Sequence, residues 1–170
     1  TEAPTIAAPL GLYDSCPITD GAAAAVLTTE SYAEAHELDA PVAISGTGQG
    51  GDNLALQDRP HLARTPAADK AAEEAYADAG VDADDVDVAE VHDCFTIAEV
   101  LAIESLGLFD PGEGIHAATE GTTTRDGEMP VNLSGGLKAK GHPVGATGGA
   151  AVATIAWVLD GTTPRADAVP

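Results

Sequence analysis

The stretch GGLKAKGHPVGATGG, residues 135–149, places a single histidine, His142, between Gly141 and Pro143 in a glycine-dense loop. Glycine lets a backbone come close to a ligand and adopt positive φ, while proline stiffens the path of the chain. The loop runs directly into the apolar segment 147–159, which we predict to be a helix. We therefore expect His142 to bind a substrate or to act on it.

Composition limits the kinds of partner. The 170 residues suffice for one domain with a core of its own. Acidic residues number 28 against 7 basic ones, for a net charge of -21, yet 44% of residues are hydrophobic, so the chain is not a disordered acidic tail. Molar salt would screen such self-repulsion, and we predict a salt-adapted protein over an ordinary acidic one. Nucleic acid is not expected as a partner, because binding phosphates needs a basic face.

The compartment is predicted from the cysteines and the hydropathy. Two cysteines, Cys16 and Cys94, are too few for a disulfide framework and are typical of a reducing environment. The sequence contains neither a membrane span nor a signal-like segment. We expect a cytoplasmic protein that does not contact a membrane.

Strand-like and helix-like segments alternate along the chain, which predicts an α/β fold. The best-marked helix has Thr65 as N-cap, Pro66 in its first turn and Gly80 as its stop. Residues 110–130 are predicted to be a loop. The remaining predicted elements are a buried strand or helix start at 20–28, helices at 29–38, 96–107 and 147–159 (the last buried on nearly every side), and strands at 41–45 and 86–91.

Residues 46–51, GTGQGG, match the dinucleotide pattern G-x-G-x-x-G. A nucleotide site of this kind needs a helix N-terminus immediately after the glycines. Here the loop residues Asp52, Asn53, Arg59 and Pro60 follow instead. We do not predict a Rossmann site.

His92 and Cys94 lie where a predicted strand meets a predicted helix, and this is where α/β folds place their ligands. A helix N-terminus also stabilises a thiolate. Taken alone, His92 and Cys94 are each more simply interpreted as core residues. Together with the His142 loop, they favour a catalytic site. Zinc is disfavoured by the ligand spacing, and no G-x-S-x-G supports a serine triad. The other candidates are interpreted as surface or structural residues: His36, His61, His116 and Cys16.

Two of the three lysines of the chain, Lys138 and Lys140, flank the histidine loop. Their retention in a chain that avoids lysine predicts an anionic ligand such as the phosphates of a large cofactor-like substrate. Solvated lysines that balance nearby carboxylates are an equal alternative.

Two motifs then identify a family resemblance. They are VHDCFTIAE at 91–99 and NLSGGLKAKGHPVGATG at 132–148, preceded by PITDGAAA at 17–24. Together they resemble the C-terminal half of a thiolase. The His-Asp-Cys-Phe form is similar to the sterol-carrier-protein-2-like and archaeal branch of acetyl-CoA acetyltransferases.

The resemblance implies an acyltransferase acting on acyl-CoA thioesters, by thiolytic cleavage of 3-ketoacyl-CoA or by condensation of two acyl-CoA molecules. His142 would activate the nucleophilic cysteine of the other half, His92 would help form an oxyanion hole, and Cys94 would move the α-proton. Coenzyme A is then a substrate, and neither a cofactor nor a metal is expected. The residues expected to bind substrate are Phe95, Ser134, Lys138, Lys140, Gly141 and Gly145.

The implied fold is a mixed sheet layered with helices, one of them buried, and lacking its last strands. We expect residues 1–170 to form one thiolase C-terminal domain, truncated at both ends, without the nucleophile domain. A longer chain or a partner subunit would supply that half, in an enzyme that is a homo-oligomer, and this chain alone would have no turnover. The alternatives are a non-catalytic thiolase-like subunit that shapes a coenzyme A channel or an assembly and, more weakly, a related condensing enzyme.

Overall fold

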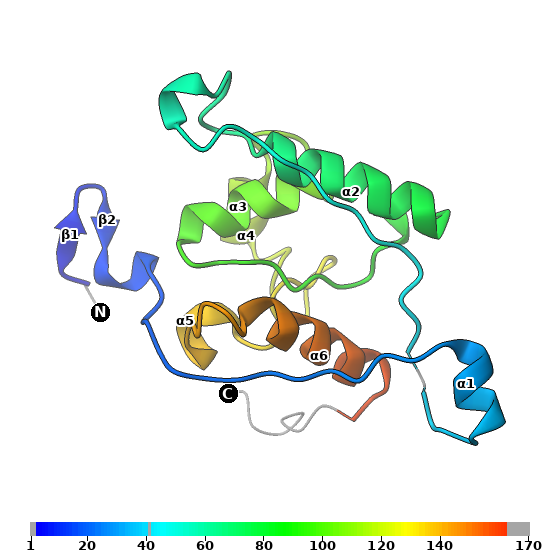
Figure 1. The fold of residues 1–170 in the computed structure, drawn as a ribbon. Coiled ribbons are helices and arrows are strands. Elements are labelled where there is room, and N and C mark those ends of the chain that lie inside the picture. Colours follow the sequence, from blue (N-terminus) through cyan, green and yellow to red (C-terminus); the bar gives the residue numbers. More distant parts are fainter. Residues whose placement is uncertain (1–2, 41, 163–170) are drawn as a thin grey trace.

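Two layers of helices build the fold, and long extended segments run beside them (Figure 1). The computed structural model describes residues 3–40 and 42–162. One layer holds α2 (Pro66–Ala79), α3 (Thr96–Ser105) and α4 (Gly114–Glu120), and the other holds α5 (Gly136–Lys140) and α6 (Thr147–Leu159). The short α1 (Glu30–Ala35) stands at one end, where the Thr29 hydroxyl caps it by accepting from the Tyr32 N–H at 3.2 Å.

Local sequence signals account for the bounds of α2. Pro66 occupies its first turn, and Gly80 ends it with a left-handed φ of 72°, as predicted. The side chain of Thr65 does not cap the helix, because its hydroxyl bonds to Ser105 on α3 instead. The Tyr76 hydroxyl donates to the Leu106 carbonyl at 2.8 Å, which ties α2 to the end of α3 a second time.

Helix α4 lies inside the region predicted to be a loop, so that prediction is wrong for residues 114–120. The Glu104 carboxylate of α3 accepts a hydrogen bond from the Gly114 N–H at 3.0 Å, at the first residue of α4. Gly114 and Ala117 are buried. A contact from an earlier helix thus stabilises a segment whose own glycines and threonines predict a loop.

Within the described residues, regular strand pairing is limited to a small antiparallel hairpin, β1 (Thr5–Ala7) and β2 (Leu10–Gly11). Three isolated bridges add to it: Ser15 with Phe95, Ile18 with His142, and Ala89 with Val131. The predicted strand 86–91 is therefore extended and bridged at one residue. Short 3-10 turns complete the elements: Leu12–Asp14, Leu56–Asp58 and Ala83–Asp85.

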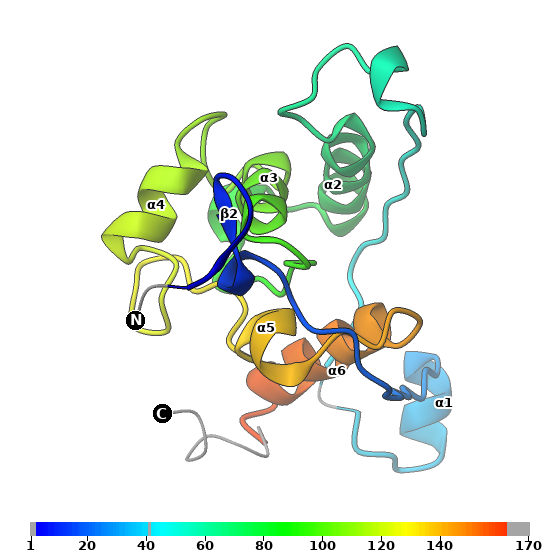
Figure 2. The same cartoon turned by 90° about the vertical axis from the view of Figure 1, so that its left-hand side faces the viewer.

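Residues 20–28 are extended along α6, but they are neither paired with another strand nor buried (Figures 1 and 2). Val26 is 96% exposed and Leu27 is 72% exposed. The prediction of a buried strand or helix is wrong here, because burial needs a neighbouring layer that the described residues do not provide.

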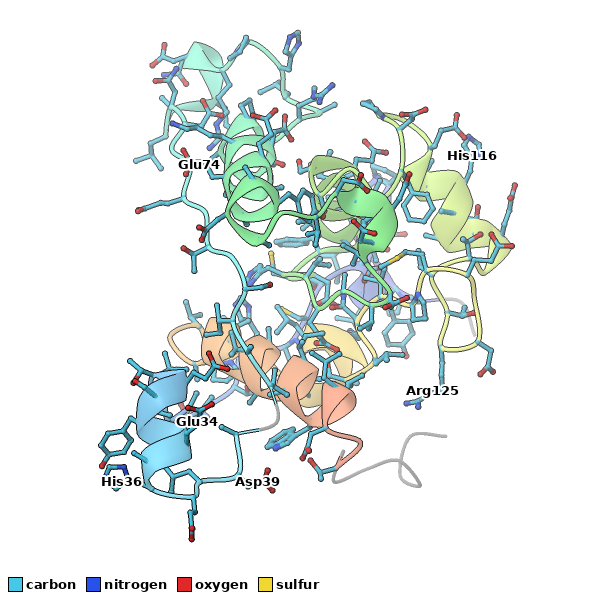
Figure 3. The ribbon with its side chains drawn as sticks, turned by 90° about the vertical axis from the view of Figure 1, so that its right-hand side faces the viewer. Glu34, His36, Asp39, Glu74, His116 and Arg125 are labelled. Atoms are coloured by element: carbon cyan, nitrogen blue, oxygen red, sulfur yellow. The ribbon has the colours of Figure 1, made fainter. Side chains whose placement is uncertain are left out.

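The extended residues 42–50 pack closely on α2. A Cβ at Gly46, Gly48 or Gly50 would collide with carbonyl oxygens of the helix, those of Ala75, Ala71 and Ala67 respectively. Figure 3 shows Glu74 on α2 beside this segment, and its carboxylate accepts from the Gln49 N–H at 3.2 Å. Gly46 and Gly48 of the G-x-G-x-x-G match therefore serve helix packing, as does Gly50, whereas a Cβ at Gly51 would meet no atom of the described residues within 4 Å. Pro41, the first residue of the strand predicted there, lies outside the described residues.

The core lies between the layers. Its fully buried side chains are Ile103 of α3 at 0% exposure and Leu137 of α5 at 1%. Helix α6 has the predicted bounds but is not buried on every side, since Val152, Trp157 and Leu159 are at least 45% exposed. In the described part of the chain, no helix is both long and apolar enough to span a bilayer.

We predict that Gly48→Ala lowers the free energy of unfolding by about 1–3 kcal/mol, the usual cost of overpacking. Gly51→Ala is the matched control, because no atom of the described residues lies within 4 Å of a Cβ built there. Urea unfolding at constant ionic strength measures both variants. Equal stability of the two would contradict close packing of this segment on α2.

Candidate active site

Three segments far apart in the sequence meet around His142. The N–H of Cys16 donates to the Cys94 carbonyl at 3.0 Å, which joins residues 15–18 to the entrance of α3. Two residues further on, Ile18 forms a parallel bridge with His142. The first segment therefore connects the His-Asp-Cys motif to the glycine-rich loop.

The two histidine rings lie against each other at this junction. The centroids of His92 and His142 are 4.8 Å apart, and their planes are inclined by 72°. Nδ1 of His142 lies 3.2 Å from the Cys16 Sγ. Its Nε2 is buried and has no hydrogen-bond partner among the described residues. A buried polar atom without a partner is costly, so this nitrogen has an unused hydrogen-bonding position within the described residues.

Asp93 fixes the glycine-rich loop against the His-Asp-Cys motif. Its carboxylate accepts from the Leu137 N–H at 2.9 Å, near the first turn of α5. The same carboxylate occupies the space where a Cβ of Gly136 would stand, and Gly136 has a φ of 61°. Glycine is therefore required at 136 by both space and conformation.

A buried network anchors the other end of α5. The Glu90 side chain is 1% exposed and accepts from the Ser134 N–H at 2.8 Å and from its hydroxyl at 2.7 Å. Lys140 contacts the same carboxylate at 3.2 Å and donates to the Ser134 hydroxyl at 2.9 Å. Ser134 and Lys140, expected to bind substrate, thus hold the loop that carries His142.

Asn132 has a similar anchoring role just before Ser134. It adopts a left-handed φ of 55°, its Oδ1 accepts from the Val91 N–H at 2.9 Å, and its Nδ2 donates to Glu99 at 2.8 Å. Burial raises the pKa of Glu99, while the bond from Asn132 opposes that rise. Asn132 thereby ties the extended segment before His92 to helix α3.

The remaining predicted binding residues lie around the histidine pair. The Lys138 ammonium donates to the Ser15 carbonyl at 2.9 Å and lies 5.0 Å from the centre of the Tyr13 ring. Gly141, with φ 88°, leaves room only for the Thr19 side chain. Phe95 is 46% exposed, and a Cβ at Gly145 would have no atom of the described residues within 4 Å.

Two hollows open beside the junction. A shallow groove of about 440 Å³ lies between residues 19–23 and 143–146. A narrower, mostly apolar pocket of about 280 Å³ is lined by Cys16, Asp93 and Lys138, together with residues of α3 and α4. The structure brings the His92 and His142 rings together beside the Cys16–Cys94 backbone hydrogen bond, and neither hollow is lined by His92, Cys94 or His142.

Sequence reasoning missed the residues that position the site, namely Cys16, Glu90, Asp93 and Asn132. Glu90 and Asn132 had a detectable signal, a polar side chain beside apolar strand residues. Cys16 had none, because its role depends on a contact 126 positions away in the sequence.

The other predicted surface histidines are exposed, as expected: His36, His61 and His116. Figure 3 shows His36 and His116 at opposite edges of the molecule. Among residues 3–40 and 42–162, no cluster of three His, Cys, Asp or Glu side chains could hold a metal ion.

We predict that Lys140→Met lowers the free energy of unfolding by about 3 kcal/mol, since it leaves the buried Glu90 carboxylate without its cation. The control is Lys70→Met, which removes an exposed pair with Glu74 and should cost less than about 0.5 kcal/mol. Urea unfolding measures both. Similar small losses would show that Lys140 does not anchor the loop.

Stability should also depend on His92. Partial burial and the nearby His142 lower the pKa of His92 below 6.5, and Asp93 opposes this. The unfolded chain therefore binds the proton more readily, and stability falls as pH drops below 6.5 toward the lower pKa of the folded state. His92→Gln should flatten this region of the stability–pH curve, whereas His61→Gln should leave it unchanged. Parallel curves for wild type and His92→Gln would contradict the assignment.

The chain resembles known proteins in sequence and in fold. A family model described as thiolase C-terminal domain-like matches residues 48–168. Acetyl-CoA acetyltransferase of Methanothermobacter thermautotrophicus is 46% identical over 92% of this chain and 40% of its own length. Sterol carrier protein 2 of Gallus gallus is 37% identical over 92% of the chain and 29% of its own length.

A solved structure titled "Ltp2-ChsH2(DUF35) aldolase" superposes with a TM-score of 0.76 at 25% identity, over 94% of this chain and 42% of the other. The chain spans about two fifths or less of the length of these curated relatives. Both expectations of fold, the α/β class and the C-terminal half, are confirmed. The protein belongs to the thiolase C-terminal domain-like family.

Proposed function

We propose that this chain supplies the His/Cys half of the active site of an acyltransferase that acts on acyl-CoA thioesters. The observation that carries the proposal is the buried Nε2 of His142, which has no partner in the described residues and stands beside the His92 ring. Charge develops on a thioester oxygen during acyl transfer, and fixed donors at that point lower the barrier. The acetyl-CoA acetyltransferases among the relatives support this class of reaction.

The proposed roles are those that the thiolase resemblance implies. His142 takes the proton of a nucleophilic cysteine and then donates to the thioester oxygen. His92 donates to the enolate oxygen of the second substrate, and Cys94 moves the α-proton of that substrate. Neither a metal nor a cofactor takes part in these steps, and coenzyme A is a substrate.

The nucleophile lies outside residues 1–170 in this proposal, in the same chain or in a partner subunit. A burial-raised pKa disfavours Cys16 as the nucleophile, and Cys94 is reserved for proton transfer. We accordingly propose that residues 1–170 form the C-terminal domain and have no turnover alone.

We propose substrate contacts for those predicted binding residues that have exposed surface. Phe95 and Gly145 offer open surface to the coenzyme A arm, and Gly141 lets the backbone pass close to the site. Lys138 is exposed, and we propose that its ammonium, which donates to the Ser15 carbonyl at 2.9 Å and to the Leu12 carbonyl at 3.3 Å, exchanges one of these contacts for a phosphate. We propose that Lys140 and Ser134 position the loop and do not contact substrate, because their polar groups are bonded to Glu90.

A non-catalytic subunit is the second candidate. The relatives include "Benzoylsuccinyl-CoA thiolase subunit BbsB" of Thauera aromatica, at 34% identity over 87% of the chain and 38% of its own length. A pure scaffold has no use for two histidines and a cysteine at one junction. The two candidates therefore differ in their response to mutation.

In the complete enzyme, Cys94→Ala and His142→Ala should each reduce acetoacetyl-CoA thiolysis roughly 10²–10⁴-fold, as expected for loss of a positioned acid or base. His116→Ala, at the edge of the molecule, is the control and should keep full activity. The measurement is the steady-state rate with CoA. Activity within a factor of two in both site variants would support the scaffold and end the catalytic proposal.

A further inference from the structure

We propose that Cys16 is a positioning residue for His142, and that its thiol leaves the imidazole free to present Nε2 either as a base or as a donor. The inference rests on the proposed function and extends it to a residue outside the two motifs. Its basis is the 3.2 Å contact between the Cys16 Sγ and Nδ1 of His142.

Backbone bonds hold the thiol in place. The Cys16 N–H donates to the Cys94 carbonyl at 3.0 Å, and Ile18 is bridged to His142 itself. The residue that contacts the ring is thus tied on either side to both motifs of the site.

A thiol can both donate and accept a hydrogen bond, and this suits an imidazole whose Nε2 must act both as a base and as a donor. When Nδ1–H donates to the sulfur, Nε2 carries a lone pair and acts as a base. When S–H donates to Nδ1, Nε2–H acts as a donor to an oxyanion. A carboxylate or a backbone carbonyl only accepts, and would keep the proton on Nδ1. When Nε2 takes a proton, the ring becomes an imidazolium whose Nε2–H donates while Nδ1–H still donates to the sulfur. The two neutral tautomers interconvert when a proton leaves Nδ1 for solvent and another is taken up at Nε2; Cys16 retains its own proton, and its hydrogen bond to the ring reverses.

The surroundings keep the thiol neutral. Burial raises the pKa of Cys16 and the nearby Cys94 adds to that, as does Asp93, while the backbone hydrogen bond and Lys138 act the other way. These groups and His92 are the titratable neighbours that the structure places around the pair. A protonated thiol both donates and accepts, and it is a poor nucleophile.

The test compares Cys16→Ala and Cys16→Ser in the complete enzyme, with Ser15→Ala as the neighbouring control. Cys16→Ala should lower kcat roughly tenfold to a hundredfold with KM within a factor of two, the loss expected for one hydrogen bond to a charging ring. Cys16→Ser should recover most of the rate, because a hydroxyl also donates and accepts. Ser15→Ala should match wild type.

A second measurement reports which nitrogen of the His142 ring carries the proton. In the ¹⁵N spectrum of this chain labelled at histidine, wild type and Cys16→Ser should give intermediate shifts for both His142 nitrogens, indicating two tautomers. Cys16→Ala should give one dominant tautomer. Unchanged tautomers and unchanged kcat in Cys16→Ala would overturn the inference, as would acylation of Cys16 by acetyl-CoA. Absence of thiolysis in wild type would instead overturn the proposed function, and the spectrum would still decide the role of Cys16.

Discussion

The hydrogen bond from the Cys16 N–H to the Cys94 carbonyl is the contact on which the site depends. It joins a segment that precedes the helical layers to the entrance of α3, and the same segment continues to the Ile18 bridge with His142. Without this connection, the Asp93, Glu90 and Asn132 contacts would still join the His-Asp-Cys motif to the glycine-rich loop, but the segment from Cys16 to Ile18 would no longer link them. The geometry of the histidine pair is therefore set by backbone pairing and buried carboxylates.

The distribution of apolar surface points to a larger assembly. Extended residues 20–28 lie along α6 with exposed Val26 and Leu27, and α6 exposes Val152, Trp157 and Leu159. Large exposed apolar patches on soluble domains mark interaction surfaces. This agrees with the proposal that a further domain or subunit, which also carries the nucleophile, completes the enzyme.

Elements with strong local signals were predictable from sequence, and elements that depend on distant contacts were not. Pro66 and Gly80 bound α2, and the apolar run after the glycine-rich loop predicts α6 with its observed ends. Helix α4 was not predicted because the contact to its first residue comes from Glu104. Residues 20–28 have a composition typical of a buried element, but composition does not say whether a covering layer is present. In the site, the two motifs indicated His92, Cys94 and His142, whereas Cys16 and the buried Glu90 became apparent only from the structure.

In the proposed mechanism, this chain provides acid, base and oxyanion groups, while a cysteine elsewhere carries the acyl group. The most direct measurement is to trap the complete protein with labelled acetyl-CoA and to locate the acyl group by peptide mass spectrometry. We expect an acylated cysteine outside residues 1–170, with Cys16 and Cys94 unmodified. An acyl group on Cys94 or Cys16 would contradict it.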